Sequence, residues 1–410
     1  MTTKLLVIGY VWPEPTTTAA GCRMQQLLEA FLAFGYEITF ASTASKTEYS
    51  LDLSALGILE TTIQLNNSSF DDFIQDLQPD VVLFDRFMIE EQFGWRVAEF
   101  APNALRVLNT EDLHALRKAR EEAHKKNITF NLDQWKNHPM TLREVASIYR
   151  CDVSMMISTF EMEILQNGLN IPSDLLFHLP FMVDISEEPL PSFEERKGFV
   201  SIGNGKHAPN VDSIKVLKNE IWPRIRKQLP KAEIHIYGAY LPQHVNEMHD
   251  PKNGFLVKGW AENVKEVLTT SRVLLAPIQF GAGIKGKLLD AMQTGTPSIT
   301  TNIGAEGMHG DQSWNGIITD DWDTFSEAAV ILHQDKETWK IAQQQGIQLL
   351  QTFYNKEKYQ LLLNERLQTL SKALDSHRSK NFTGKMLQHQ TMASTKYMAK
   401  WIEGKHKNKF

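Results

Sequence analysis

Leu5-Leu-Val-Ile8 is the first of three segments, all within the first 45 residues, that decide the fold. Such a short apolar run is suited to a parallel strand that is buried on both faces. Residues 23–34 then carry apolar side chains at the spacing of one helix face, and Gly35 stands where a helix C-cap belongs. Ile38-Thr-Phe40 supplies the next strand. The three segments predict a β-α-β unit, whose crossover connection implies parallel pairing.

The same alternation continues along the chain. Further strands are expected at 80–84, 106–108 and 153–157, and then at 199–202, 233–237, 255–257, 273–276 and 298–300. Helical spacing occurs between them, notably at 70–77, 93–100, 140–150, 210–229 and 286–293, and again from 322 to 374. Strands that alternate with helices are typical of open parallel α/β sheets. We therefore predict an α/β protein with two tandem, doubly wound, Rossmann-like domains and a cleft between them.

The domain boundaries follow from length and composition. A chain of 410 residues exceeds what one hydrophobic core usually organises. Prolines and acidic residues interrupt the alternation between Pro172 and Pro191, which predicts a linker there. We expect one domain over residues 1–190, a second over 191–370, and a basic C-terminal tail over 371–410. That tail has nine Lys or Arg and two Asp or Glu, in a chain of net charge −6.

The tail has the pattern of an amphipathic helix over 385–403. One broad face would hold Leu387, Tyr397, Met398, Trp401 and Ile402, and the opposite face Lys385, His389, Lys396 and Lys400. Such a helix can lie in the interface of an anionic membrane. The alternatives are a helix that docks on the N-terminal domain and a disordered end.

Composition also limits the compartment and the partners. No stretch approaches the roughly 20 apolar residues of a membrane span, and the N-terminus lacks the features of a signal peptide. The only two cysteines, Cys22 and Cys151, allow no disulfide framework and no cysteine-rich zinc site, and we expect both to be packing residues. We expect a cytoplasmic protein, with possible peripheral contact at the inner face of the membrane. Nucleic acid is not an expected partner, because the body of the chain is acidic.

The most informative motif is Pro277-Ile-Gln-Phe-Gly-Ala-Gly-Ile-Lys-Gly-Lys-Leu-Leu-Asp-Ala-Met292, which follows an apolar strand and opens a helix. Glycines let a phosphate approach the backbone, and the free amides at a helix N-terminus attract anions. Lys285 and Lys287 can neutralise a diphosphate, and Asp290 can accept hydrogen bonds from ribose hydroxyls. On spacing alone, a glycine turn before an amphipathic helix with solvated lysines fits as well.

Seven segments in order resemble the donor domain of glycosyltransferase family 4. They are Ala208-Pro-Asn-Val-Asp212, Ile221-Trp-Pro-Arg-Ile225, Ile236-Tyr-Gly238, Gly259-Trp260, the glycine–lysine motif, Gly295-Thr-Pro297 and Gly304-Ala-Glu-Gly307. The resemblance implies a GT-B fold, with an acceptor-side first domain and a donor-binding second domain. It implies transfer of a hexose-type unit from a nucleoside diphosphate sugar to a carbohydrate or lipid-linked saccharide acceptor, with retention of configuration. No metal or other cofactor is expected, because fixed lysines and helix amides usually do that electrostatic work in this architecture.

The family's donor ligands can be carried over position by position. The resemblance implies that the phosphates face Gly283, Ile284 and Lys287, with Lys206 as a second phosphate ligand, that Asp290 binds the ribose and that Trp260 lies beside the base.

Two positions depart from the family's two-glutamate motif. The second glutamate is the shorter Asp290, and the first falls on Ala282. These departures keep two alternatives open. One is a nucleotide-sugar 2-epimerase of GT-B fold, which would need acid/base carboxylates in the cleft. The other is a catalytically silent homologue that binds nucleotide sugar or partners.

The first helix opens with Ala20-Gly-Cys-Arg23, where the family usually has a glycine-rich turn that faces the cleft. The resemblance implies that Gly21 approaches the donor. Arg23 is a candidate to hold a phosphate or an acceptor anion. A plain helix cap with a surface arginine is the alternative.

Asn109-Thr-Glu-Asp-Leu-His-Ala-Leu-Arg117 follows a strand, so its polar groups emerge at the carboxyl end of the sheet. The Asp-x-His pattern is similar to one at the acceptor side of the family's cleft. Asp112 and His114 are therefore the candidate catalytic residues: Asp112 either orients His114 or acts on an acceptor hydroxyl itself. Ser158-Thr-Phe-Glu161 also matches a family motif, but we interpret it as a capping box at a helix start.

Overall fold

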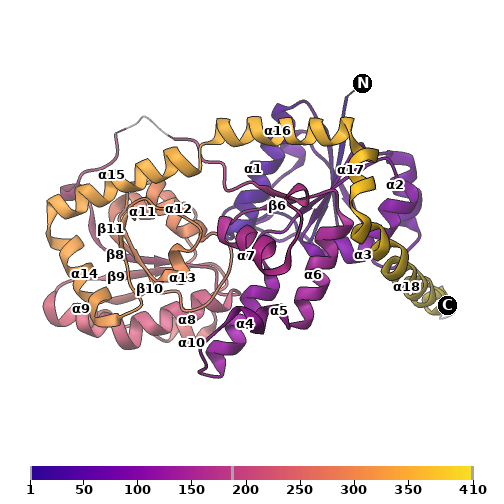
Figure 1. Ribbon diagram of the computed structural model, residues 1–410. Helices are drawn as coiled ribbons and strands as arrows, with labels where there is room; N and C mark the ends of the chain where they lie inside the picture. The colour runs from indigo at the N-terminus through magenta and orange to yellow at the C-terminus, as the bar shows by residue number, and fades with distance from the viewer. Residues whose placement is uncertain (1, 186–188, 408–410) are drawn as a thin grey trace.

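The computed structural model of the protein describes residues 2–185 and 189–407. Within them, seven strands form one sheet in the order β3-β2-β1-β4-β5-β6-β7, and six form another in the order β10-β9-β8-β11-β12-β13. Every strand pairing is parallel. The prediction of two doubly wound sheets is confirmed (Figure 1). Residues 186–188 of the expected linker and 408–410 of the expected tail lie outside the described residues.

The first sheet contains β1 (Lys4–Gly9), β2 (Glu37–Ser42), β3 (Leu59–Thr62), β4 (Val81–Asp85), β5 (Leu105–Asn109), β6 (Val153–Met156) and β7 (Leu176–His178). The second contains β8 (Lys197–Ile202), β9 (Ile234–Tyr237), β10 (Phe255–Gly259), β11 (Ser271–Ala276), β12 (Ser298–Thr300) and β13 (Gly316–Ile318).

Helices cover both faces of each sheet. Around the first sheet are α1 (Ala19–Ala33), α2 (Ser69–Leu77), α3 (Phe87–Phe100), α4 (His114–Lys125), α5 (Leu132–Lys136), α6 (Pro139–Arg150) and α7 (Thr159–Leu169). Around the second are α8 (Ala208–Val216), α9 (Trp222–Gln228), α10 (Gln243–Asn246), α11 (Val264–Thr270), α12 (Gly286–Gln293), α13 (Asn302–Ala305), α14 (Trp322–Gln334) and α15 (Lys336–Phe353). The chain ends with α16 (Lys356–Lys372), α17 (Leu374–Lys380) and α18 (Phe382–Lys407).

Three strands were not predicted, namely β3, β7 and β13. All three are three or four residues long and lie at the outer edge of a sheet. An edge strand buries less than a central one; Leu59 of β3, for example, is 58% exposed. Such strands lack the apolar run that marked the central strands.

Helix α16 crosses back to the first sheet. Its apolar residues Tyr359, Leu363, Leu367 and Leu370 are buried in the same cluster as α1 and β1 (Figure 1). The last part of the expected second domain, 191–370, therefore packs on the first sheet. The helical spacing of 322–374 could not predict this, because it does not indicate which sheet each helix covers. The two crossing segments pair with each other, since Val183 N donates to Tyr354 O at 2.7 Å and Lys356 N donates to Val183 O at 3.2 Å.

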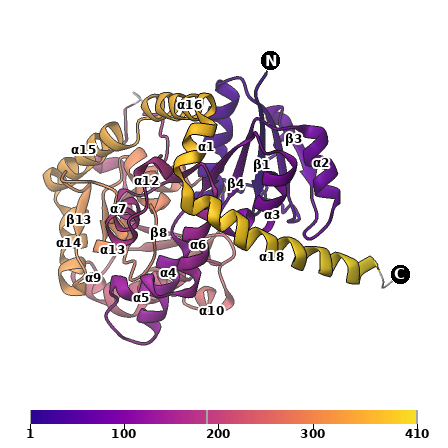
Figure 2. The same ribbon diagram turned by 45° about the vertical axis from the view of Figure 1, so that its right-hand side comes forward.

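The basic tail docks on the first domain. Arg378 of α17 donates to both carboxylate oxygens of Asp152 at 2.8 Å, and α18 packs against α6 and α3 (Figures 1 and 2). Of the alternatives for the tail, the structure supports a helix that docks on the N-terminal domain. The alternative of a disordered end is wrong up to residue 407. Among the described residues, no helix is long and apolar enough to cross a membrane.

Arg196 holds the start of the second domain together. Its side chain is fully buried, stands just before β8 and stacks on Trp339. The guanidinium donates to the backbone oxygens of Pro191, Leu268, Ser271 and Thr294 and to the Thr296 hydroxyl. One cation thus ties the end of the linker to α11, to β11 and to the turn before β12.

Replacement of this cation should weaken the whole fold. Arg196→Met leaves several buried carbonyl oxygens without a donor, so we expect the free energy of unfolding to fall by about 3 kcal/mol or more. Urea unfolding of the full chain measures this. Lys197→Met, at the exposed neighbouring position, is the control and should change the value by less than about 0.5 kcal/mol. Equal losses in the two variants would contradict this role of Arg196.

Candidate donor and acceptor site

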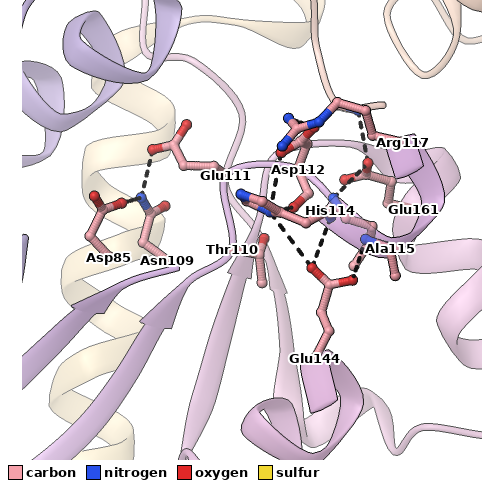
Figure 3. Close-up of polar contacts among 12 residues, drawn as sticks. Asp85, Asn109, Thr110, Glu111, Asp112, His114, Ala115, Arg117, Glu144 and Glu161 are labelled. Atoms are coloured by element: carbon pink, nitrogen blue, oxygen red, sulfur yellow. Dashed lines mark hydrogen bonds and ion pairs between the residues drawn. The ribbon is translucent and has the colours of Figure 1, made fainter. Parts of the chain in front are cut away.

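Two buried carboxylates hold the loop between β5 and α4 (Figure 3). The first amides of a helix have no intrahelical acceptor. Glu144 of α6 accepts hydrogen bonds from His114 N at 2.9 Å and Ala115 N at 3.2 Å, and Glu161 of α7 accepts one from Leu113 N at 3.1 Å. Burial raises the pKa of each carboxyl group to about 8. Carboxyl groups of α6 and α7 therefore fix the start of α4 and the candidate catalytic loop before it.

His114 presents one ring nitrogen to its own loop and keeps the other unbonded. Its Nδ1 lies 3.0 Å from the Asp112 carbonyl oxygen and 3.4 Å from Asp112 Oδ1. Burial lowers the pKa of the imidazole to about 4, against the opposing effect of Asp112, so the ring is neutral near pH 7. A proton on Nδ1 would point at Asp112, which leaves Nε2 as an acceptor. No described residue bonds to Nε2.

Asp112 is engaged on both sides. It pairs with Arg117 and lies beside His114. Burial by itself would raise the pKa of Asp112, but Arg117, His114 and His207 together lower it to about 2. Both carboxylate oxygens of Asp112 are engaged, by Arg117 and by His114, whereas His114 Nε2 bonds to no described residue. The geometry therefore favours orientation of His114 over direct action on a hydroxyl. His207 lies in the loop after β8, so the second domain also contributes to this cluster.

The glycine loop before α12 lies directly against this acidic loop. Gly283 N donates to Glu161 Oε1 at 2.8 Å, and a Cβ added at Gly283 would stand 2.7 Å from Asp112 Cβ. Gly283 also has φ of +64°, a conformation that favours glycine. Its amide is therefore not available to a phosphate in this conformation, contrary to the expectation. Ala282, beside it, packs on the apolar cluster of the first domain.

The capping-box interpretation of Ser158 and Glu161 is wrong. Ser158 is the N-cap residue of α7, but its side chain makes no capping hydrogen bond. Glu161 is instead fully buried and accepts from one backbone amide in each domain. The bond to the second domain cannot be read from local spacing.

The polar residues of α12 face the cleft with few partners. Lys287 Nζ donates to Asn210 Oδ1 at 2.8 Å and Lys285 Nζ to Gly283 O at 2.8 Å. Burial lowers the pKa of both ammonium groups to about 8. No described residue donates a hydrogen bond to the Asp290 carboxylate, whereas the Asp290 backbone oxygen accepts from Thr294. Burial raises the pKa of the carboxyl group to about 6, although Lys265 lowers it. The Ile284 side chain is buried in the second core, so only its backbone remains as a ligand.

A cavity of about 580 Å³ lies in the second domain. It is lined by Tyr237 at the end of β9 and by 261–263, Glu266 and Val267 before and within α11. Trp260, 41% exposed, adjoins it in sequence, and its ring centroid lies 5.1 Å from that of Tyr49 of the first domain. Lys206 is exposed, with Nζ 3.5 Å above the Tyr240 ring.

Two expected site residues do not reach the cleft. A Cβ on Gly21 would lie 2.3 Å from the Glu14 backbone, so Gly21 faces its own loop rather than a donor. Arg23 is fully buried, where its Nε donates to Asn109 Oδ1 at 3.2 Å and its Nη1 to Pro180 O at 2.9 Å. The alternative of a surface arginine is wrong, because the side chain is buried. Its Nη2 bonds to no described residue, and the role of an anion ligand stays a prediction.

Four residues of the site were missed or misread: Arg117, Glu144, Glu161 and His207. Arg117 belongs to the motif from Asn109 to Arg117, and His207 follows Lys206 after a strand, so both had a sequence signal. Glu144 lies within an ordinary amphipathic helix and had none. In the described part of the chain, no group of three or more His, Cys, Asp or Glu is placed to hold a metal ion.

The buried carboxyl group of Glu161 should make stability depend on pH, because burial disfavours its ionised form. Its pKa in the folded protein, about 8, lies above the ordinary 4.5, so stability is lost as pH rises through that interval. Glu161→Gln retains the acceptor oxygen without the charge. We therefore expect the free energy of unfolding of the variant, relative to that of the wild type, to rise by on the order of 2 kcal/mol between pH 5 and pH 9.

Urea unfolding at pH 5 and pH 9 measures that gain. Glu163→Gln, at an exposed position of the same helix, is the matched control and should show no pH-dependent difference. A constant difference between Glu161→Gln and wild type across this range would contradict a buried, proton-binding carboxyl group.

The chain is similar to known proteins in sequence and in fold. Residues 196–335 match the family model described as Glycosyl transferases group 1. No curated protein sequence matches the chain. Among solved structures, sucrose-phosphate synthase from Thermosynechococcus elongatus has a TM-score of 0.68 at 14% identity and covers 90% of this chain and 100% of its own.

Two further structures are similar. HepE of Anabaena, in complex with UDP and glucose, has a TM-score of 0.65 at 12% identity and covers 90% of this chain and 100% of its own. A glycosyltransferase from Rickettsia africae ESF-5 has a TM-score of 0.63 at 12% identity, with 91% and 99% covered. At these identities the likeness shows the fold alone. The chain has the GT-B fold, and its second domain matches the group 1 glycosyl transferases.

Proposed function

We propose that the protein is a family 4 glycosyltransferase. It transfers a hexose-type unit, with retention of configuration, from a nucleoside diphosphate sugar to a carbohydrate or lipid-linked saccharide acceptor. The observation that carries the proposal is the contact between the glycine loop and the acidic loop: Gly283 lies against Asp112. A diphosphate bound at the start of α12 would therefore present its sugar close to His114. The HepE neighbour, bound to UDP and glucose, supports a nucleotide-sugar donor.

The donor fits the second domain in three parts. The base enters the cavity beside Tyr237 and Trp260, and the unbonded Asp290 carboxylate accepts hydrogen bonds from the ribose. Lys287 and the first amides of α12 hold the diphosphate and stabilise the charge that develops as it departs. Lys206 would have to leave the Tyr240 ring to join them. In this assignment no divalent cation is required.

The acceptor fits the side of the cleft formed by the first domain. His114 Nε2 accepts the hydrogen bond of the acceptor hydroxyl that attacks the sugar, while Asp112 fixes the tautomer and the orientation of the ring. Arg117 and His207 keep Asp112 ionised. Asp112 is thus a positioning residue, and His114 is the group that contacts substrate.

The basic tail extends the proposal to location. Its excess of Lys and Arg favours peripheral contact with an anionic membrane surface. In a cytoplasmic protein this contact would bring the cleft to a lipid-linked acceptor at the inner face of the membrane.

The phosphate assignment predicts the loss of donor binding in one variant. Nucleotides that bind the native protein raise the midpoint of thermal unfolding, by a few degrees at high saturation. We expect such a shift for one of UDP, GDP, ADP or dTDP, or for its sugar, in the presence of EDTA. Lys287→Ala should abolish this shift, and Lys231→Ala, at an exposed site on the same domain, should retain it. An unchanged shift in Lys287→Ala would contradict the assignment.

The acceptor assignment predicts a loss of turnover without a loss of donor binding. The assay uses the nucleotide sugar that raises the unfolding midpoint, together with a panel of saccharide acceptors. In His114→Ala, kcat for release of the nucleoside diphosphate should fall about 10²–10⁴-fold. The donor-dependent thermal shift should remain. His244→Ala, at an exposed site without a described partner, is the control. Donor binding without any turnover in the wild type would favour the silent homologue, and interconversion of donor sugars would favour the 2-epimerase.

A further inference from the structure

Helix α18 is fixed to the first domain along one face. α6 ends at Arg150, and the last carbonyl groups of a helix have no intrahelical donor. Asn381 Nδ2 donates to Tyr149 O at 2.8 Å, and Gln388 Nε2 donates to Arg150 O at 3.0 Å. Gly384 lies so close that an added Cβ would stand 2.2 Å from Tyr149 O. The helix is therefore held in one orientation on the protein surface.

The opposite face of α18 exposes large apolar side chains. Phe382 is 75% exposed, Met386 50%, Tyr397 69% and Trp401 57%. At 100° per residue these four fall within about 100° of one another around the helix axis. The expected grouping of Leu387 and Ile402 with Trp401 is wrong, because both are half-buried on the docked side. Figure 2 shows α18 extending beyond the body of the first domain, which leaves its outer end open to a partner.

Three lysines around this apolar face have no carboxylate partner among the described residues. Lys385, Lys400 and Lys405 are exposed and form no ion pair with any described residue. Lys405 Nζ lies 3.7 Å above the Trp401 ring. Aromatic and methionine side chains flanked by unpaired lysines are typical of helices that lie in the interface of anionic membranes, where the lysine stems extend to the headgroups. Charge complementarity thus points to an anionic lipid surface.

A groove of about 470 Å³ between α3 and α18 adjoins the apolar face. It is lined by Trp95 and Glu99 of α3 and by Lys385, Gln388, His389 and Lys396 of α18. Lys396 pairs with Glu99, which neutralises the carboxylate of the groove. The remaining groups are mainly donors.

The donors of the groove include one that lacks an acceptor. Trp95 is only 3% exposed, and no described group accepts a hydrogen bond from its indole Nε1. Lys385, His389 and Lys396 lie within about 40° of one another on the helix, next to the sector of Phe382. A ligand with anionic oxygen atoms would pair with Lys385 and His389 while it lies beside the apolar face.

We propose that α3 and α18 form a binding site for the phosphate headgroup of an anionic membrane lipid. The groove receives the phosphate, and Phe382, Met386, Tyr397 and Trp401 enter the interface. This inference rests on the membrane contact in the proposed function, but not on sugar transfer. The docked face of α18 keeps the first domain, and with it the acceptor side of the cleft, in a fixed orientation to the membrane.

Vesicle co-sedimentation of the full chain, without donor, tests the proposal. Binding is expected to vesicles of phosphatidylcholine with phosphatidylglycerol and not to phosphatidylcholine alone, and it should weaken as salt is raised. Lys385→Gln should weaken it about fivefold, the equivalent of about 1 kcal/mol per lysine. Tyr397→Ala with Trp401→Ala should weaken it about tenfold or more, through lost apolar burial.

Matched controls carry equal changes on exposed sites elsewhere. Lys227→Gln of α9, and Ile341→Ala with Leu361→Ala, should bind as wild type does. The altered side chains are exposed, so the midpoints of thermal unfolding should stay unchanged. His114→Ala should bind vesicles as the wild type does, and this result would separate membrane binding from the proposed reaction.

Three results would overturn the proposal. They are equal binding to both kinds of vesicle, no binding to either, and full binding by the α18 variants. Stabilisation of the wild type, but not of Lys385→Gln, by inorganic phosphate without vesicle binding would assign the groove to a soluble phosphate compound instead.

Discussion

One buried carboxylate oxygen joins the two halves of the molecule. Glu161 Oε1 accepts from Leu113 N of the acidic loop and from Gly283 N of the glycine loop, and both hydrogen bonds are buried. An unpaired buried amide costs about 1–3 kcal/mol, so the loops are held at this one oxygen. The arrangement requires glycine at 283 and turns the Asp112–His114 segment towards the donor side. Arg120, which donates to both Glu306 oxygens at 2.7 and 2.8 Å, secures the same contact from the far side.

Much of the fold could be predicted because central parallel strands are short apolar runs bounded by polar turns. The strand Ser298–Thr300 and the helix Gly286–Gln293 have the predicted bounds. Three of the four edge strands, β3, β7 and β13, could not be predicted, because a short, partly exposed strand has no such signal; the fourth, β10, was predicted at 255–257. Nor could the return of α16 to the first sheet, because the period of a helix gives its buried face and not the element that covers it.

Two motifs of the site were predictable because they follow a strand, although His207, which also follows one, was missed. The Asp112–His114 motif and the glycine–lysine motif each lie at the carboxyl end of a sheet, and the structure brings them into contact. Glu144 and Glu161 could not be assigned, because they act on backbone amides that only folding brings near. The burial of Arg23 could not be predicted for a related reason. Its acceptors, Asn109 Oδ1 and Pro180 O, are distant in sequence, and they allow the guanidinium to lie in the interior.

The return of α16 has a consequence for how the chain is made. The apolar cluster on one face of the first sheet contains α1, near the N-terminus, and α16, which begins only at Lys356. A ribosome releases the chain from its N-terminus, and domains generally fold as they emerge. Here the first sheet must wait, with one face partly uncovered, until the second domain has been synthesised. The domain that begins first is therefore completed last.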